Sequence, residues 1–265
     1  MIIDTHTHAF PDKIAAKAIA GLEAGSGEKA LLDGTVSDLL RSMDRSGVDT
    51  SFVLNIATKP EQFVPMLAWS KAVRSERIVP FLSIHPDDPC AVERLSIMRD
   101  EGFIGIKLHP YYQGFVLNEP KMMPIYEALS SLGLILICHT GFDIAYPRNR
   151  ICDPEKIADV ITRFPKLKFV ATHFGAWLDY DEVKKHLIGK DVYIEISFSL
   201  KYMSVETARE LFDGHSHDRI MFGTDSPWDD QAKAIRSLDT FGFDAERKAK
   251  LLGGNAAGLI GAVRT

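Results

Sequence analysis

The chain has 265 residues, 46% of them hydrophobic and 25% charged, which is the composition of an ordinary globular protein. It carries 31 basic and 36 acidic residues, giving a net charge of −5, and no basic block occurs. This balance argues against a nucleic-acid-binding surface as the main function.

Two features bear on where the protein acts. No apolar run reaches the ~18 residues of a membrane span, and the start at Met1 lacks the basic and apolar segments of a signal peptide. The three cysteines, Cys90, Cys138 and Cys152, are scattered and odd in number, which favours reduced thiols. We therefore expect a cytoplasmic protein that begins at Met1 and binds neither membrane nor nucleic acid. Whether it forms a homodimer is left open.

A short apolar run followed by a longer amphipathic stretch recurs along the chain. The predicted strands are Met1–Thr5, Thr50–Asn55, Ile78–Ile84, Phe103–Leu108, Leu134–Cys138, Leu167–Thr172, Val192–Ser197 and Arg219–Thr224. The predicted helices are Val36–Ser46, Glu61–Arg74, Ala91–Glu101, Pro120–Leu132, Pro154–Phe164, Tyr180–Leu187, Val205–Phe212 and Asp244–Ile260. This alternation indicates a parallel sheet covered by helices. Eight units in this length favour a single α/β domain over 1–265, a (β/α)8 barrel.

The connection Ala9–Thr35, between the first strand and the first helix, is longer than the usual loop of about 2–6 residues. It contains a glycine cluster and a predicted short helix of its own, Lys13–Leu22. An insertion at this end of a barrel is either a lid over the active site or a passive surface excursion, and the sequence does not separate the two.

Catalytic residues in such barrels come from the carboxyl ends of the strands. The polar residues at those ends are His6, His8, Asn55, His85, Lys107, His109, His139, His173, Glu195, Ser197 and Asp225. Six of the nine histidines belong to this set. The other three, His186, His215 and His217, lie on a predicted helix and in a loop, and we expect them on the solvated surface.

His6 and His8 are the most specific element of this set. Side chains two residues apart on a strand point to the same face, so both imidazoles can face the barrel mouth, and imidazole suits zinc, iron and nickel. His139 and His173 each end an apolar strand, and Asp225 follows another. Each has a structural alternative, namely a half-buried histidine or an aspartate that caps the next helix. Together, three neutral nitrogen donors and one carboxylate suit a divalent ion with room for water.

The sequences at several strand ends resemble those of the amidohydrolase superfamily, and within it those of the branch that contains aminocarboxymuconate-semialdehyde decarboxylase. The similar segments are Gly105–Pro110, His139–Gly141, Gly223–Pro227 and Gly254–Ala257. The resemblance covers the chain apart from the Ala9–Thr35 insertion. It implies metal ligation by His6, His8, His139 and Asp225, and a catalytic acid/base role for His173. We expect one divalent ion, and we expect it to be zinc.

The sequence of strand four differs from that of the decarboxylase. Lys107 on this strand resembles the carboxylated lysine that bridges two metals in dihydroorotase-like members. In that case His173 would bind a second ion. Alternatively, an unmodified Lys107 pairs with a substrate carboxylate, which we prefer, or it forms a buried structural ion pair. His109, Arg148 and Arg150 are further candidates for substrate binding, although the two arginines are equally explicable as solvated loop charges.

The predicted chemistry follows from the metal. A divalent ion can supply hydroxide near neutral pH and polarise a carbonyl. Asp225 would accept the proton of the water, and His173 would protonate a leaving group or hold a developing oxyanion. We therefore predict a hydrolase acting on an amide, lactone or ester bond of a small, acidic metabolite. The alternative is a non-oxidative decarboxylase of a conjugated carboxylate. A third is a metal-bound barrel without turnover, against which the acid/base His173 argues.

Overall fold

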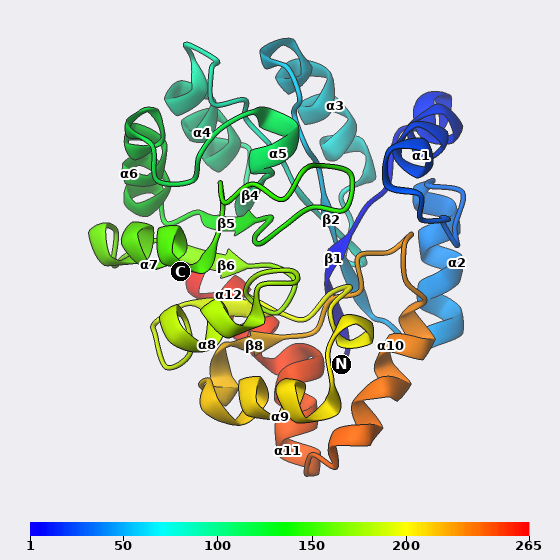
Figure 1. The fold of residues 1–265 in the computed structure, drawn as a ribbon. Coiled ribbons are helices and arrows are strands. Elements are labelled where there is room, and N and C mark those ends of the chain that lie inside the picture. The colour runs from blue at the N-terminus through cyan, green and yellow to red at the C-terminus, as the bar shows by residue number, and fades with distance from the viewer. Residues whose placement is uncertain (265) are drawn as a thin grey trace.

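The computed structural model describes residues 1–264, and within them eight parallel strands alternate with helices around a central barrel (Figure 1). The strands are β1 Ile3–Thr7, β2 Thr50–Leu54, β3 Ile78–Phe81, β4 Gly105–Leu108, β5 Ile135–Cys138, β6 Lys168–Ala171, β7 Tyr193–Glu195 and β8 Ile220–Met221. Most are shorter than predicted, and β1 begins two residues later than the predicted Met1–Thr5. His6 therefore lies within a strand and not after it.

Two sheets, β1-β2-β3 and β4 to β8, share the barrel wall. Backbone hydrogen bonds join them at both seams. The Lys107 amide donates to Leu82 O (2.7 Å) between β4 and the end of β3, and the Thr5 amide donates to Phe222 O (3.0 Å) between β1 and the end of β8. The wall is thus continuous, and the prediction of a (β/α)8 barrel is confirmed.

Helices cover the outside of the barrel (Figure 1). Apart from α1, which is described below, those before β8 are α2 Val36–Ser46, α3 Phe63–Val73, α4 Ala91–Asp100, α5 Pro110–Gln113, α6 Met123–Leu132, α7 Pro154–Arg163, α8 Tyr180–His186 and α9 Val205–Gly214. Local signals set their limits. Asp153 caps α7 by accepting a hydrogen bond from the Lys156 amide, and Gly47 ends α2 in the left-handed region at φ 73°.

The segment after β8 holds elements that the sequence did not predict. It forms α10 Gln231–Ser237 and η5 Leu238–Phe241, and then α11 Ala245–Ala249, the π-turn η6 Lys250–Gly254 and α12 Asn255–Arg264, which follow one another without a break over the predicted helix Asp244–Ile260. The sequence prediction missed α10, although Asp230 caps it by accepting from the Lys233 amide. The side chain of Asp244 caps α11 in the same way, by accepting from the Arg247 amide.

Apolar side chains fill one end of the barrel. Ile3, Phe52 and Phe81 from the first three strands pack with Ala256 and Leu259 of α12 in one buried cluster. The rings of Phe52 and Phe81 stack with their centroids 4.8 Å apart. Because this end is closed by apolar packing, the polar residues that follow the strands meet at the other end, where the site lies.

The insertion after β1 forms α1 Asp12–Ser26, which is longer than the predicted Lys13–Leu22. Ala15 is its only fully buried residue among those described. Ile19 packs so closely over Gly34 that a Cβ at Gly34 would come within 2.7 Å of it, and Gly34 has φ +80°. In Figure 1, α1 stands at the rim of the barrel, across a gap from α3.

The three histidines expected on the surface differ in how deeply they are buried. His217 is exposed and His186 is half-buried, whereas His215 is buried. Its Nε2 lies 2.9 Å from Val192 O, and its Nδ1 accepts from the Gly189 amide at 3.3 Å. The prediction for His215 was wrong because two backbone groups distant in sequence satisfy both of its ring nitrogens. None of the described helices is long and apolar enough to cross a membrane.

Candidate metal centre and active site

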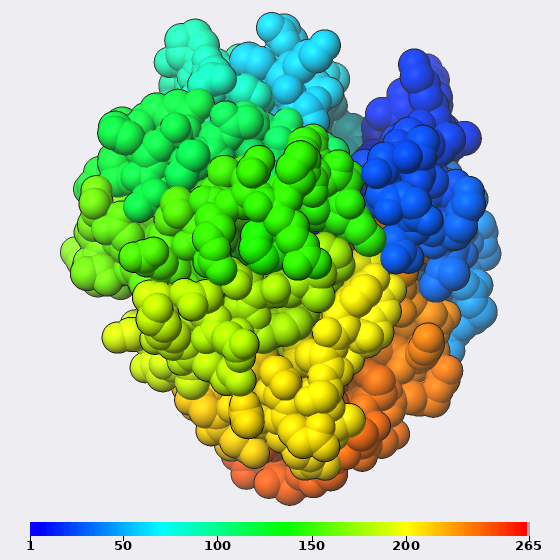
Figure 2. Space-filling view, viewed as in Figure 1, coloured from blue at the N-terminus to red at the C-terminus, as the bar shows by residue number. Residues whose placement is uncertain are grey.

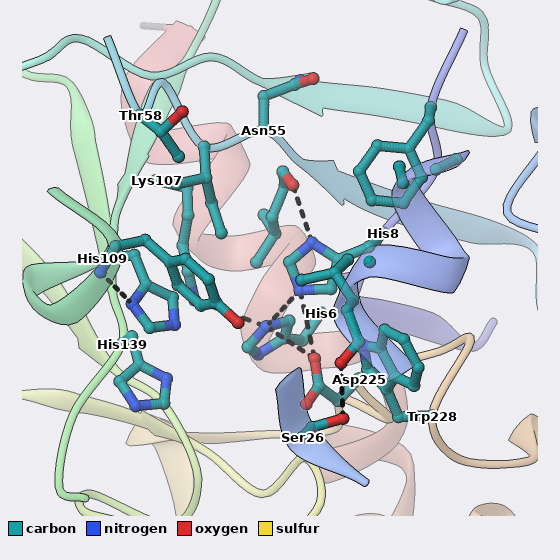
Figure 3. Close-up of a pocket in the computed structure, with 18 of the residues that line it drawn as sticks. His6, His8, Ser26, Asn55, Thr58, Lys107, His109, His139, Asp225 and Trp228 are labelled. Atoms are coloured by element: carbon teal, nitrogen blue, oxygen red, sulfur yellow. Dashed lines mark hydrogen bonds and ion pairs between the residues drawn. The ribbon is translucent and has the colours of Figure 1, made fainter. Parts of the chain in front are cut away.

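His6, His8 and Asp225 converge at the mouth of the barrel (Figure 3). The Nε2 atoms of the two histidines lie 3.2 Å apart, and each is 3.2 Å from Asp225 Oδ1. Strand β1 positions both histidines on one face, as predicted, and the turn after β8 brings Asp225 to them. The structure therefore brings together three of the four residues expected to bind a metal.

The hydrogen bonds of the other ring nitrogens define the chemistry of this group. His6 Nδ1 lies 2.8 Å from Glu195 Oε1, and His8 Nδ1 lies 2.9 Å from the carbonyl oxygen of Leu54. Both Nδ1 atoms therefore carry the ring proton, which leaves a lone pair on each Nε2. Two lone pairs and a carboxylate oxygen then face one another, and a single proton cannot satisfy all three contacts. A divalent cation can, so these residues fit a metal ion.

The protonation states of His6 and Asp225 also fit a metal ion. Burial, followed by the positive charge of Lys107, holds the pKa of His6 well below its usual value, so its ring is neutral near pH 7. Burial opposes ionisation of Asp225, but the contact with His8 and the positive charge of Lys107 lower its pKa. Neutral imidazoles beside an ionised carboxylate are the forms that bind metal.

Asp225 and His173 also have an uncommon backbone. Asp225 has φ 68° and His173 has φ 56°, in the left-handed region that residues with a Cβ rarely adopt. Such a conformation costs of order 1–3 kcal/mol and persists only where the surroundings impose it. It turns both side chains into the mouth of the barrel immediately after their strands. Strain of this kind is concentrated at functional sites.

His139 and His173 form a second contact. His139 Nδ1 lies 3.0 Å from His173 Nε2, while His139 Nε2 lies 3.1 Å from Phe142 O and His173 Nδ1 lies 3.2 Å from Ser197 O. The carbonyl groups fix the ring protons on the far nitrogens, so two lone pairs face each other here as well. The structure thus pairs His139 with His173 and not with Asp225, and Figure 3 shows His139 on the opposite side of the cavity from Asp225.

The side chains of Glu195 and Ser197 contact both His6 and His173. Glu195 Oε1 accepts from the backbone amide of His173 (3.0 Å) as well as from His6, and its Oε2 accepts from the Ser197 amide (2.7 Å). Ser197 Oγ lies 3.0 Å from His6 Nδ1 and 3.1 Å from His173 Nδ1. Sequence reasoning placed both residues at a strand end without a role. Their contacts fix the ring orientation of both histidines.

Lys107 is fully buried, and its Nζ lies 3.4 Å from His6 Nε2. Burial lowers its pKa, although the charges of Glu195 and Asp225 oppose this. Among the described residues no carboxylate pairs with it within 4.0 Å, so the structural ion pair considered from the sequence is not formed. Lys107 lines the same cavity as the histidines, which is the position that both remaining alternatives require.

His109 stacks on His139, with ring centroids 4.0 Å apart and planes 13° apart. Its Nε2 lies 3.4 Å from Asp143 Oδ2, which is also 3.7 Å from His139 Nε2. Sequence reasoning missed Asp143, which follows His139 by four residues and follows no strand directly. The signal available was an acidic residue in the loop after β5, and such a residue is common on surfaces.

Arg148 and Arg150 do not reach the cavity. Neither belongs to its lining, and Arg150 Nη2 instead lies 2.9 Å from Asp179 Oδ1. Both guanidinium groups lie over the ring of Phe142, at 5.4 and 5.8 Å from its centroid. The expectation that these arginines clamp a substrate carboxylate is therefore not supported, because the loop turns them outward.

One cavity of about 750 Å³ joins the histidines of the site, Lys107 and Asp225. Its lining includes His6, His8, Lys107, His109, His139, His173 and Asp225. Aromatic walls surround this polar centre, namely Phe142, Trp177, Phe198 and Trp228. The indole N–H of Trp177 is buried, and it has no hydrogen-bond partner among the described residues. It can donate to an oxygen of a bound ligand.

A (β/α)8 barrel whose strands end in histidines and an aspartate around one cavity has the architecture of a metal-dependent barrel enzyme. The family model for amidohydrolases matches residues 3–262, so this chain belongs to the amidohydrolase family. Enzymes of this family are metal-dependent. The family inferred from the strand ends is thereby confirmed.

Similar proteins cover the chain to different extents. A curated dihydroorotase of Pseudomonas fluorescens is 26% identical over 156 residues, 54% of this chain and 44% of the relative, so the match spans less than half of the relative's length. A TIM-barrel protein of Bordetella bronchiseptica is 17% identical, covering 100% of this chain and 99% of that chain, with a TM-score of 0.76. A 5-carboxyvanillate decarboxylase of Novosphingobium aromaticivorans, complexed with manganese, is 16% identical, covering 98% and 96%, with a TM-score of 0.70. At these identities the two structures support the fold.

Proposed function

We propose that this chain is a hydrolase that uses one divalent ion, zinc, held by His6, His8 and Asp225. The observation that carries the proposal is the convergence of two Nε2 lone pairs and Asp225 Oδ1 within 3.2 Å of one another. Imidazole and carboxylate are ligands that zinc prefers, and three protein ligands leave a position open for water or substrate. The whole barrel would act as one catalytic domain.

The ion, when bound, would acidify a water molecule and polarise a carbonyl group. The residues of the chain then handle protons and position the substrate. Asp225, ionised because its pKa is lowered, accepts the proton of the attacking water. His173 Nε2, whose lone pair faces the cavity while Ser197 O holds its Nδ1–H, would take this proton from Asp225 and pass it to the leaving group. Lys107 and His109, which line the cavity beside them, bind the carbonyl or carboxylate oxygen of the substrate.

A two-ion site is the alternative, and one observation favours it. The facing lone pairs of His139 and His173, 3.0 Å apart, form a second place where a cation would satisfy two ring nitrogens. Lys107 is buried next to His6 with a lowered pKa, and a neutral amine is the form that reacts with carbon dioxide to give a carbamate. A carboxylated Lys107 would then bridge the two ions. Counting the ions per chain decides between the alternatives.

Decarboxylation of a conjugated carboxylate is the competing reaction. It requires a clamp for the carboxylate, and the arginines considered for that role lie outside the cavity. Lys17 and Lys107 are the cationic side chains among the described residues that line it. Lys107 suits the carboxylate of a hydrolysable substrate equally well, so the clamp does not distinguish the two reactions. We place hydrolysis first because the sequence of strand four, with Lys107, departs from that of the decarboxylase.

A substrate panel tests this choice. The zinc-loaded protein would be incubated with lactones, N-acyl compounds and conjugated carboxylates, and acid release and CO2 would be followed separately. We expect acid release from a lactone, ester or amide. The Asp225→Asn variant, which retains the shape of the side chain, should release none. Stoichiometric CO2 from a benzoate-like acid, without hydrolysis of any compound, would show that the decarboxylase alternative is correct.

A further inference from the structure

The cavity extends from the histidines to a space between two helices. On α1 its lining residues are Ile14, Lys17, Ala18, Gly21 and Leu22. On η1 (Pro60–Gln62) and α3 they are Gln62, Pro65, Met66 and Trp69. Both sets repeat at three to four residues, so each is one face of a helix. Figure 2 shows the surface hollowed between these two segments, which are drawn in dark blue and cyan.

Helix α1 has two apolar faces. Ala15 and Ile19 pack toward the rest of the fold, where Ile19 lies against Gly34. Ile14, Ala18 and Leu22 form the face that lines the cavity, and Ile14 is 50% exposed there. An apolar stripe on a surface helix is normally buried against another element. Here the cavity itself lies opposite the stripe, and the aliphatic side chains of Pro65 and Met66 form its other wall.

Charge is sparse at this end of the cavity. Away from the histidines, the charged lining residues are Lys17 and Glu28. Glu28 Oε1 lies 3.2 Å from the hydroxyl of Tyr202, which donates to it. The volume of about 750 Å³ is in the upper part of the range of small-molecule sites, about 300–1,000 Å³. A small polar metabolite at the histidines would leave the apolar walls of α1 and α3 in contact with water.

We propose that the substrate carries an apolar substituent of the size of an acyl chain, which lies between α1 and α3 while its reactive group faces the histidines. The insertion after β1 is therefore a binding wall that selects the substrate. The identity of the reactive group rests on the proposed function, whereas the position of the apolar part rests on the two helix faces. Burial of this part would contribute to affinity in proportion to the apolar area removed from water.

Calorimetric titration with straight-chain carboxylates tests this proposal without turnover. Butyrate, hexanoate, octanoate and decanoate would be titrated into the zinc-loaded protein. We expect affinity to rise by about fourfold per methylene, since burying one is worth about 0.8 kcal/mol. Ile14→Asp should weaken decanoate binding by about tenfold or more and leave butyrate binding close to that of the parent. Ala16→Asp places the same charge on the exposed, non-lining side of α1 and should change neither.

Other results would overturn the proposal. These are an affinity that does not depend on chain length, or an equal effect of Ile14→Asp and Ala16→Asp. Circular dichroism checks that both variants are folded, and Ile14→Ser, which adds no charge, serves if the aspartate variant is not. Zinc content measured on the same samples reports on the proposed function separately. A protein that binds zinc but shows no chain-length dependence would refute the apolar wall alone.

Discussion

Glu195→Gln separates a residue that positions a metal ligand from one that only supports the fold. Glu195 is fully buried and accepts hydrogen bonds from His6 Nδ1 (2.8 Å), from the amide of His173 (3.0 Å) and from the amide of Ser197 (2.7 Å). Glutamine has the same shape but offers one acceptor oxygen and two N–H donors. Whichever way the amide is turned, its nitrogen faces a donor. A Cβ added at Gly223 would clash with Glu195 Oε2, so the backbone of Gly223 packs directly against this carboxylate.

Two effects of different size follow from these contacts. One buried donor is left without an acceptor, which should lower the free energy of unfolding by about 1–3 kcal/mol. In addition, His6 loses the carboxylate that fixes its ring orientation and raises the basicity of Nε2. Loss of such a partner should weaken zinc binding by about 10- to 100-fold.

Zinc affinity would be measured by competition with a chelator of known affinity, and stability by urea unfolding of the metal-free protein. Tyr126→Phe is the matched control, because it removes a fully buried hydroxyl that donates to Leu117 O (2.6 Å) far from the histidines. It should lower stability by about 1 kcal/mol and leave zinc affinity unchanged. If Glu195→Gln binds zinc as tightly as the parent, Glu195 does not act through His6, and the reasoning from ring orientation is wrong.

Three further changes test other parts of the site. His173→Ala should retain zinc while kcat falls by about 10²- to 10⁴-fold, and near-parental turnover in steady-state assays would remove His173 from the mechanism. Lys107→Ala should keep one ion per chain and mainly raise KM for an acidic substrate; loss of metal, with activity rescued by short-chain acids, would instead indicate a carboxylated lysine. Burial raises the pKa of Asp4 from 3.8 to about 6, so the folded state binds more protons between these values and its stability falls as pH rises through them. Relative to Asp4→Asn, the metal-free parent should lose roughly 2 kcal/mol between pH 4 and 7 in urea unfolding, and a constant difference would contradict this.

Much of the barrel could be predicted because its signals are local. Apolar runs of strand length, helix caps such as Asp153 and the glycine that ends α2 depend on neighbouring residues alone. Parallel strands bring their carboxyl ends to one edge, so His6, His8 and Asp225 could be placed together from their order in the chain. After β8, the predicted helix over Asp244–Ile260 is present with a π-turn inside it, whereas the short helix α10 before it was missed.

The remaining features depend on contacts distant in sequence. His139 ends its strand as predicted, but the carbonyl group of Phe142 turns its ring toward His173. Arg150 lies in a loop without regular structure and pairs with Asp179, whose position comes from another loop. Burial of His215 depends on a carbonyl group 23 residues earlier in the chain. None of these partners can be identified by spacing or propensity.

Metal content measures directly whether His6, His8 and Asp225 bind a divalent ion. Elemental analysis of protein purified without added metal should find about one ion per chain, zinc foremost. His6→Ala and Asp225→Ala should lose it, because each removes one of the three atoms that lie 3.2 Å apart. His217→Ala, an exposed histidine outside the cavity, should retain it. If His6→Ala and Asp225→Ala both hold as much metal as the parent, the ion does not bind at this site.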